Sequence, residues 1–390
     1  MPKLKLIRIT TVPASLNTLL RGQLKYMKQF YDVYGVSSDG SRLKEVEQRE
    51  DIKTFAVNMT RTISPFKDLK ALFQLIRLFR AEKPAIVHTH TPKAGTLGMI
   101  AAMLAGVPIR MHTVAGLPLL EASGMKRSLL NIVEKITYSC ATAVYPNSIK
   151  LKEIILQSKF CKATKLKVIG NGSSNGIDIT HYDPSVISDE CKTALKNKIG
   201  IKNNDTVFSF VGRMVKDKGV EELVRAFIKL YDQNKNIRLV LVGSFEKDLD
   251  PLSEEIENII FNHSNIYAAG HQKDVRVYFS ITDVFVFPSY REGFPNVVMQ
   301  AGAMGVPSVV SDINGCNEII MHGTNGLIVP PKDTESVLEA MNKMLTEKDS
   351  RIEMSSKCRD MIISRYSQQF VWEHLLEEYR QQASLYNISE

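Results

Sequence analysis

The sequence alternates between short apolar segments and helix-forming segments, and this alternation runs through the chain twice. In the first half, runs rich in Val, Ile and Leu predict strands at residues 4–10, 32–36, 85–88, 109–113 and 143–147. Strands separated by helices form parallel sheets with helices on both faces. The pattern restarts at Val207 and predicts strands at residues 207–211, 238–242, 266–268, 284–287, 308–311 and 326–328. The sequence therefore predicts an α/β protein with two Rossmann-like, doubly wound domains.

The length of the chain agrees with two domains, because 390 residues exceed what one hydrophobic core normally supports. A glycine- and serine-rich loop at residues 170–178 separates the two rounds of strands and helices. We predict one domain at residues 1–180 and another at residues 190–366, facing each other across a central cleft. Residues 367–390 are expected to form a helix that packs back on the first domain.

The cysteine pattern and the apolar runs of the sequence indicate the cellular compartment and whether disulfides or zinc stabilise the fold. The five cysteines are scattered, so the sequence predicts neither a disulfide framework nor a zinc ribbon. The chain starts directly with a predicted strand and shows no signal-peptide pattern. Its longest apolar run, residues 97–109, is shorter than the ~18–20 residues that cross a bilayer. We expect a cytoplasmic protein.

Charge is divided unequally between the two halves. Residues 1–185 contain 27 Lys and Arg against 13 Asp and Glu, a net charge of +14, whereas the rest of the chain carries −6. A basic half favours an anionic partner, and an anionic membrane surface fits best. Nucleic acid is not expected as a partner, because no recognition motif accompanies the charge.

Two segments are candidates for contact with a membrane. A predicted helix at residues 64–80 has an apolar stripe (Phe66, Leu69, Leu72, Phe73, Ile76 and Phe79) and basic residues elsewhere (Lys67, Lys70, Arg77 and Arg80). Such a helix usually packs on a sheet, and this is the favoured interpretation. The second segment, residues 117–130, mixes apolar residues with Lys126 and Arg127, as interfacial segments do. For this segment, packing and membrane contact remain equally open.

Two cations follow the first strand of the second domain. Gly212 and Arg213 end the predicted strand at 207–211, and Lys218 and Gly219 precede a predicted helix at 220–232. Because Arg213 and Lys218 are separated by a single turn, both side chains can reach one anion. Solvated surface cations are the ordinary alternative. The position after a buried strand and a glycine favours an anion site.

A carboxylate and several glycines lie at residues 288–307, on a turn that leads into an apolar helix. Backbone N–H groups at the start of a helix attract a diphosphate. Glu292 can accept hydrogen bonds from sugar hydroxyls. The alternative is that Gly293, Gly302 and Gly305 only permit turns and close helix packing. Polar loops at the ends of the following strands favour a site for a nucleotide sugar.

Histidine and threonine gather at strand ends in the first domain. His88, His90 and Thr91 follow one strand, and His112 lies near the end of the next. We expect them to point into the cleft. Metal binding is not predicted, because no cysteine or carboxylate accompanies the histidines at ligand spacing.

These motifs resemble the retaining GT-B glycosyltransferases of family 4, in the branch that builds cell-surface polysaccharides on lipid-diphosphate carriers. The likeness rests on the Glu292 to Pro295 motif, the two cation motifs and the segments at residues 11–24, 88–95 and 171–178. The resemblance implies catalytic roles for Arg213, Lys218, Glu292 and His112. It implies donor contacts from Gly212, Gly293, Phe294, Pro295, Asn296 and Gln300, and acceptor contacts from Ser15, His88, His90, Thr91 and Lys93.

The same resemblance implies a UDP-sugar donor, with an N-acetylated hexosamine as the sugar, and a polyprenyl-diphosphate-linked saccharide as acceptor. It also implies retention of configuration without a metal or other cofactor, at the inner face of the cytoplasmic membrane, in capsule, O-antigen or exopolysaccharide synthesis. Two positions depart from the family pattern. Gln300 replaces a glutamate that binds the ribose, and Ala115 replaces a histidine. A sugar-nucleotide epimerase and a catalytically silent nucleotide-sugar-binding protein are the alternatives.

Overall fold

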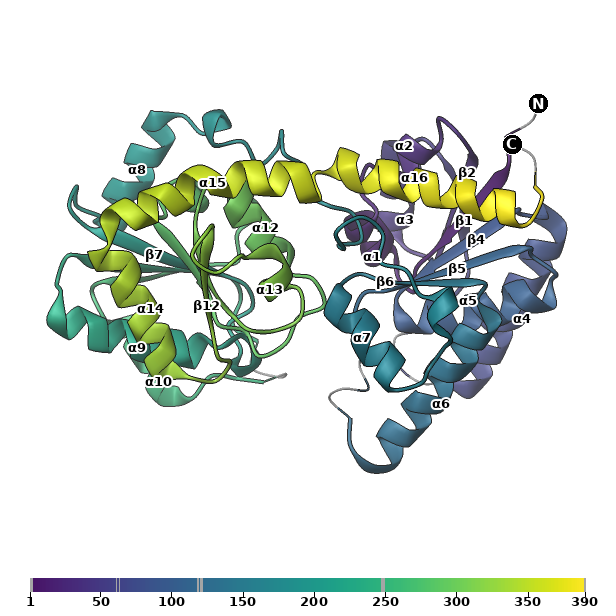
Figure 1. Ribbon diagram of the computed structural model, residues 1–390, viewed down its shortest axis with the longest axis horizontal. Helices are drawn as coiled ribbons and strands as arrows, with labels where there is room; N and C mark the ends of the chain where they lie inside the picture. The colour runs from purple at the N-terminus through teal and green to yellow at the C-terminus, as the bar shows by residue number, and fades with distance from the viewer. Residues whose placement is uncertain are drawn as a thin grey trace. The chain divides into compact units, whose positions relative to one another are not determined.

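A computed structural model describes residues 3–60, 62, 64–117, 119, 122–246 and 250–388. The chain divides into two compact units. Unit 1 comprises Met1–Gly176 and Gln368–Glu390, and unit 2 comprises Ile177–Ser367 (Figure 1). The last helix of the chain thus belongs to the same unit as its first residues.

Unit 1 is built on a parallel six-stranded sheet with the order β3-β2-β1-β4-β5-β6. The strands are β1 (Lys5–Ile9), β2 (Asp32–Ser37), β3 (Lys53–Ala56), β4 (Ile86–His90), β5 (Ile109–Val114) and β6 (Ala143–Pro146). Five of them confirm the sequence prediction. Strand β3 was missed, because it is an edge strand whose residues are only partly buried and therefore lacks a continuous apolar run.

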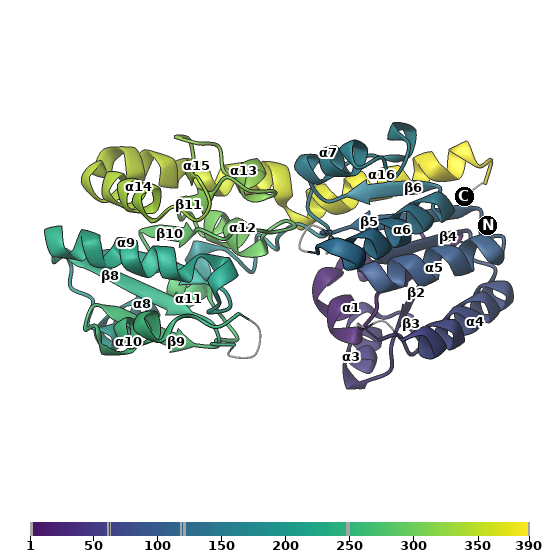
Figure 2. The same ribbon diagram turned by 90° about the horizontal axis from the view of Figure 1, so that it is seen from below.

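Helices cover both faces of this sheet, and each face has its own core cluster. One face carries α4 (Pro65–Glu82), α5 (Pro92–Leu104), α6 (Gly124–Cys140) and α7 (Ile149–Gln157). The other carries α1 (Pro13–Leu19), α2 (Gln23–Met27), α3 (Ser41–Glu50) and α16 (Gln368–Leu385). Figure 2 shows α4, α5 and α6 side by side, with α5 in the middle.

Aromatic contacts attach α16 to unit 1. The rings of Trp372 and Tyr26 lie 5.4 Å apart, and those of Tyr379 and Tyr31 lie 5.6 Å apart. Gly22 permits this approach, because a Cβ atom there would lie 2.7 Å from the Trp372 ring. The Trp372 indole also donates a hydrogen bond of 2.7 Å to Asn175 Oδ1.

Unit 2 repeats the architecture with the strand order β12-β11-β10-β7-β8-β9. All six predicted strands are confirmed, as β7 (Thr206–Val211), β8 (Ile237–Val242), β9 (Ile266–Gly270), β10 (Val284–Phe287), β11 (Ser308–Ser311) and β12 (Gly326–Val329). Its helices are α8 (Asp189–Ile199), α9 (Val220–Gln233), α10 (Glu254–Asn262), α11 (Arg276–Phe279), α12 (Asn296–Ala303), α13 (Cys316–Ile319), α14 (Thr334–Thr346) and α15 (Lys348–Tyr366).

Both sheets have a topological switch point, where the order of strands reverses. In unit 1 it lies between β1 and β4, and in unit 2 between β7 and β10. Ligands of open parallel sheets bind outside the carboxyl ends of the strands at such a point. Functional groups are therefore expected in the loops after these four strands.

Helix α4 differs from the favoured expectation that its apolar stripe packs on the sheet. Its buried side chains are Ala71, Leu75 and Phe79. Phe66, at 91% exposure, and Phe73, at 62%, face solvent, and Leu69 is exposed as well. The stripe read from the sequence is wider than the face that α5 and the sheet cover, so only part of it is buried.

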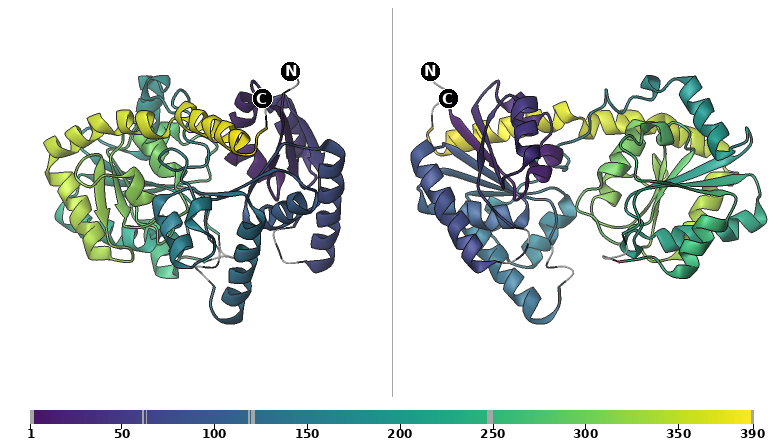
Figure 3. Two further views of the ribbon diagram at one scale, coloured as in Figure 1. Left: turned by 45° about the vertical axis from the view of Figure 1, so that its right-hand side comes forward. Right: turned by 180° about the vertical axis from the view of Figure 1, so that it is seen from behind.

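The second candidate for membrane contact, residues 117–130, is also partly buried and partly exposed. Leu117 and Leu119 are buried in the core, whereas Met125 and Leu129, at the start of α6, are exposed. Pro118 and Leu120 lie outside the described residues. Figure 3 shows the start of α6 projecting away from the rest of unit 1. In the described part of the chain, no helix combines the length and the apolar character that crossing a bilayer requires.

Candidate functional site

An ion pair joins the two loops at the switch point of unit 2. Lys218 ends the 3₁₀ turn Lys216–Lys218 after β7, and Glu292 follows β10. Lys218 Nζ lies 2.6 Å from Glu292 Oε1, and the two side chains are only 14% and 18% exposed. Ser289 Oγ donates a further hydrogen bond of 3.3 Å to the same carboxylate oxygen. The structure therefore brings together two residues that the sequence placed in one site from separate motifs.

Glycine at position 219 makes this approach possible. Gly219 has a φ of 69°, and a Cβ atom there would lie 2.0 Å from the carbonyl oxygen of Pro288. The start of α9 can lie against the end of β10 only without that side chain. The backbone next to Lys218 is thereby held beside the loop that carries Glu292.

Unit 2 also contains a cavity of about 340 Å³, which is lined by Gly212, Arg213 and Gln300 but not by Lys218 or Glu292. This volume is within the range of about 300–1,000 Å³ that is common for small-molecule sites. Arg213 is 44% exposed, and its guanidinium lies 3.2 Å from Glu246. The cavity is also lined by residues that follow β8 and β9 and that were not predicted as site residues: Gly243, Ser244, His271, Gln272 and Lys273. Their position after the ends of parallel strands is the sequence signal for a ligand site.

The loop that carries Glu292 is fixed by contacts that have no local sequence signal. Asn314 Nδ2 donates hydrogen bonds to the carbonyl oxygens of Glu292, at 3.1 Å, and Gly293, at 2.6 Å. Phe294 packs against Tyr366, with the ring centroids 5.4 Å apart. Pro295 then directly precedes α12, and Asn296 is the exposed first residue of that helix.

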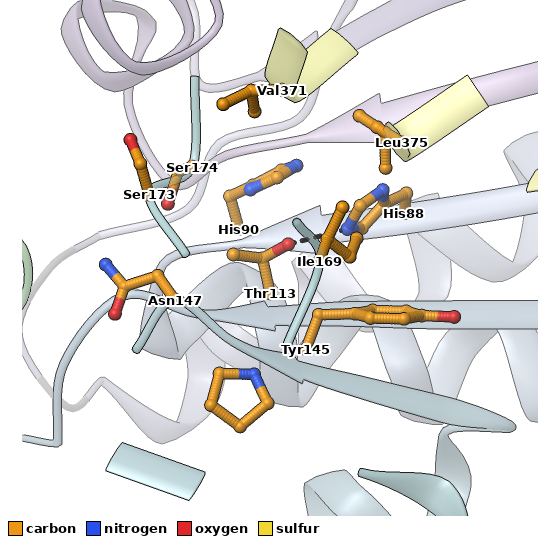
Figure 4. Close-up of a pocket in the computed structure, with 11 residues that line it drawn as sticks. His88, His90, Thr113, Tyr145, Asn147, Ile169, Ser173, Ser174, Val371 and Leu375 are labelled. Carbon is orange, nitrogen blue, oxygen red and sulfur yellow. Dashed lines mark hydrogen bonds between the residues drawn. The ribbon is translucent and has the colours of Figure 1, made fainter. Parts of the chain in front are cut away.

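In unit 1, His88 and His90 point from β4 toward the face that carries α16. His88 Nδ1 lies 2.7 Å from Tyr379 Oη, and its Nε2 lies 2.7 Å from Thr113 Oγ1. His90 Nε2 lies 2.7 Å from a guanidinium nitrogen of Arg8. Figure 4 shows His88 and Thr113 meeting in a small cavity, which Val371 and Leu375 of α16 also line.

His112 lies on the opposite face of the sheet from His88 and His90, so the structure does not bring the three histidines together. In the sheet register His112 pairs with Thr89, and alternate residues of a strand face opposite sides. Its Nδ1 lies 2.8 Å from Thr89 Oγ1, on the face of α5. A Cβ atom on Gly95 of α5 would come within 2.3 Å of the His112 ring.

Burial keeps these histidines neutral. It lowers the pKa of His112 from 6.5 to about 4. It also holds the pKa values of His88 and His90 well below 6.5, and the nearby Arg8 guanidinium adds to the effect on both. At neutral pH the three rings therefore act as hydrogen-bonding groups and carry no charge.

The remaining predicted acceptor residues lie near the start of α1 and α5. Thr91 precedes α5 with a φ of 71°, which is unusual for a β-branched residue and is common at functional sites. Its hydroxyl lies 2.8 Å from that of Thr11, across the switch point between β1 and β4. Lys93 forms an ion pair of 2.5 Å with Asp68 of α4. Ser15 lies in the first turn of α1 and is partly buried.

Two Rossmann-like units, each with polar side chains gathered at its switch point, define the GT-B class of glycosyltransferases. Comparison with known proteins agrees. The family model "Glycosyl transferase 4-like domain" matches residues 25–172, and "Glycosyl transferases group 1" matches residues 192–361. The capsular polysaccharide biosynthesis glycosyltransferase CapM of Staphylococcus aureus is 35% identical over 378 residues, which is 96% of each chain.

A second relative and one solved structure of similar fold are informative. An Escherichia coli enzyme named UDP-Gal:alpha-D-GlcNAc-diphosphoundecaprenol alpha-1,3-galactosyltransferase is 32% identical over 80% of this chain and 79% of its own. The crystal structure of Anabaena HepE in complex with UDP superposes with a TM-score of 0.79 at 18% identity, covering 97% of this chain and all of that one. The chain therefore belongs to the group 1 glycosyltransferases, and its N-terminal part is a glycosyltransferase 4-like domain.

Proposed function

We propose that this protein transfers a sugar from a UDP-sugar to a lipid-diphosphate-linked saccharide, with retention of configuration and without a metal ion. The observation that carries this proposal is the Lys218–Glu292 pair at the switch point of unit 2, and the same unit contains a cavity lined by Arg213 and Gln300. The HepE complex with UDP and the lipid-linked acceptor in the name of the Escherichia coli relative support the choice of substrates. An N-acetylated hexosamine is the proposed sugar.

In the proposed reaction an acceptor hydroxyl attacks the anomeric carbon of the donor, and the bond from that carbon to the β-phosphate oxygen breaks. Arg213 and Lys218 stabilise the negative charge that develops on the leaving diphosphate. The departing phosphate takes the proton of the attacking hydroxyl, on the face from which it leaves, so that configuration is retained. Glu292 accepts hydrogen bonds from sugar hydroxyls and orients the ring. The two cations supply the charge stabilisation that a divalent ion would otherwise provide.

A paired binding and transfer experiment tests this proposal. Thermal unfolding with UDP, GDP, ADP and their sugar conjugates identifies the donor, since a ligand that binds only the native state raises Tm. Transfer is then measured with that donor and a short-chain prenyl-diphosphate saccharide, with and without EDTA. We expect stabilisation by uridine nucleotides and EDTA-resistant transfer. Release of a modified free sugar without acceptor would instead indicate an epimerase, and binding without turnover on any acceptor would indicate a silent binding protein.

We further propose that unit 1 binds an anionic membrane through α4 and α6. The exposed apolar residues of α6 follow helical spacing and form one stripe, namely Met125, Leu129, Ile132 and Ile136. Exposed Phe66, Leu69 and Phe73 form a second stripe on α4, and both helices flank α5 on the same face of the sheet. We call these two stripes the apolar rim.

Charge around the apolar rim suits an anionic lipid surface. Lys67, Lys70 and Arg77 on α4 and Lys126 and Lys135 on α6 are exposed beside the stripes. Interfacial segments combine apolar side chains, which enter the acyl boundary, with basic residues that contact anionic headgroups. The high net charge of residues 1–185, +14, acts in the same direction. An enzyme bound in this way would meet its lipid-linked acceptor at the surface that contains it.

A further inference from the structure

Arg8 is a fully buried cation on β1, close to the switch point of unit 1. It has no exposed surface, and one of its terminal nitrogens donates hydrogen bonds to Gln23 Oε1, at 2.6 Å, and to His90 Nε2, at 2.7 Å. Its other two nitrogens, Nε and the second terminal one, are buried without a hydrogen-bond partner. Within the described residues, no carboxylate lies within ion-pair distance of Arg8.

A buried charge without a counter-ion is costly for a folded protein. The Tyr379 ring, whose centroid lies 6.0 Å from the guanidinium carbon, offers only a weak cation–π contact. Arginine stays protonated even when burial lowers its pKa. The positive charge of Arg8 is therefore present at the switch point before any ligand arrives, and it favours an anion there.

Arg8 also determines which nitrogen of His90 carries the proton. A guanidinium can only donate, so His90 Nε2 accepts, and in the neutral ring the proton must lie on Nδ1. Both nitrogens of His88 are already occupied, by Tyr379 and Thr113. Within the described residues, His90 Nδ1 has no partner, so it is the histidine N–H available to a ligand.

The cavity that His90 lines is suited to an oxygen with negative charge. Its polar lining residues besides the histidines are Thr113, Tyr145, Asn147, Ser173 and Ser174, and its apolar ones are Pro146, Ile169, Val371 and Leu375 (Figure 4). The described lining contains no carboxylate. Its volume of about 20 Å³ has room for about one oxygen-sized group.

We propose that this cavity is an oxyanion subsite, which receives one phosphoryl oxygen of the acceptor diphosphate. His90 donates its Nδ1–H to that oxygen. Arg8 is a positioning residue, which fixes the tautomer of His90 and supplies the uncompensated charge behind it. This inference rests on the proposed function and deepens it, because it assigns the diphosphate of the acceptor to a site in unit 1 that is separate from the donor cations in unit 2.

The test follows the ring nitrogens of His90 by NMR in the full-length protein labelled with ¹⁵N-histidine, with the signals assigned from a His90→Gln variant. In the wild type, we expect a protonated Nδ1 and a hydrogen-bond-accepting Nε2. Inorganic pyrophosphate should shift the Nδ1 signal. The Arg213→Ala variant serves as a control, because it weakens pyrophosphate binding in unit 2 and should leave the response of His90 intact.

Two substitutions of Arg8, to Met and to Lys, then distinguish a positioning role of this residue from a role in packing alone. Arg8→Met should remove the shift of the His90 Nδ1 signal with pyrophosphate. It should raise the acceptor KM at least about tenfold and leave the donor KM unchanged. Tm should stay equal or rise, because an uncompensated buried charge is gone. Arg8→Lys should restore part of the acceptor affinity. An unshifted Nδ1 signal in the wild type, or an unchanged acceptor KM in a folded Arg8→Met protein, overturns the inference. Absence of transfer with every acceptor, alongside an intact response of His90 to pyrophosphate, would instead count against the proposed function.

Discussion

Lys218 Nζ lies 2.6 Å from Glu292 Oε1, although the two residues are 74 positions apart in the chain. The pair forms because β7 and β10 are neighbours in the sheet and both end at the switch point of unit 2. Since the two side chains are largely buried, each restrains the position of the other. Donor binding and transfer should therefore depend on both.

Removing the cation of this pair should affect turnover far more than folding. Lys218→Ala is expected to lower kcat/KM at least about 100-fold, a typical loss when one group that stabilises developing negative charge is removed. Lys229→Ala is the matched control, because Lys229 forms an exposed ion pair with Glu335 in the same unit. Steady-state kinetics and thermal unfolding check both variants. A Lys218→Ala enzyme with nearly wild-type turnover would contradict the assignment.

The glycine beside Lys218 allows a test of close backbone approach. Gly219 and Gly200 have φ angles of 69° and 76°, but a Cβ atom on Gly200 would meet open space. Gly200→Ala should cost about 1–2 kcal/mol for the left-handed conformation alone. Gly219→Ala should cost about 1–3 kcal/mol more through overlap with Pro288, and should also lower activity. Equal shifts of the urea midpoint in the two variants would show that the approach is not tight.

Gln300 lines the cavity of unit 2 that we propose for the donor, at the position where the resemblance implies a ribose-binding glutamate. A carboxylate accepts stronger hydrogen bonds than an amide, so Gln300→Glu should tighten UDP binding about fivefold, which corresponds to about 1 kcal/mol. The gain should disappear with 2′,3′-dideoxy-UDP, which has no ribose hydroxyls to donate. Calorimetric titration measures both ligands. If the gain is the same with the dideoxy nucleotide, Gln300 does not contact the ribose.

Buried histidines should make the protein sensitive to mild acid. The pKa of His112 is lowered from 6.5 to about 4, so between these pH values the unfolded chain binds a proton that the folded protein does not. The free energy of unfolding should therefore fall as the pH falls through this window, by up to about 1.4 kcal/mol per pH unit from His112. His112→Asn should make the pH dependence shallower in urea titrations at pH 7, 6 and 5. An unchanged slope would show that His112 is charged or accessible in the folded state.

The sequence predicted the strands of both sheets well where they are continuously apolar and end in glycine or a polar turn. The segment Thr206–Val211, followed by Gly212, is an example, since a strand buried on both faces needs such a run. Strand β3 lacked this signal. The pairing of Lys218 with Glu292 could not be predicted as a contact, because it depends on the order of strands in the sheet, although each residue was identified by its own motif.

The acceptor side of the site was harder to predict for a different reason. The sequence indicated that histidines end β4 and β5, but the face to which each points depends on the register between these strands. His112 pairs with Thr89, so it shares the face of Thr89 and not that of His88. Arg8 was not predicted as a functional residue, because a single arginine in a short apolar segment gives no sign of whether its charge is compensated in the fold.

The apolar rim gives a prediction about where the enzyme works. Replacing Met125, Leu129 and Ile132 by serine should weaken binding to vesicles that contain phosphatidylglycerol by at least about 100-fold, since each exposed apolar side chain would otherwise be buried at the lipid interface. Ile352→Ser on α15 is the control, because Ile352 is similarly exposed in unit 2. Sedimentation with vesicles measures binding, and added salt should weaken it in the wild type.

The same triple variant separates membrane binding from chemistry. It should lose turnover on a long-chain acceptor embedded in vesicles and keep its turnover on a short-chain acceptor in solution, because the three substituted residues lie on α6 of unit 1 and do not line the cavity of unit 2 that we propose for the donor. Equal losses on both acceptors would mean that the substitutions damage the fold or the site. Unchanged vesicle binding would show that α6 does not contact the lipid, and the basic residues near the rim would then need another explanation.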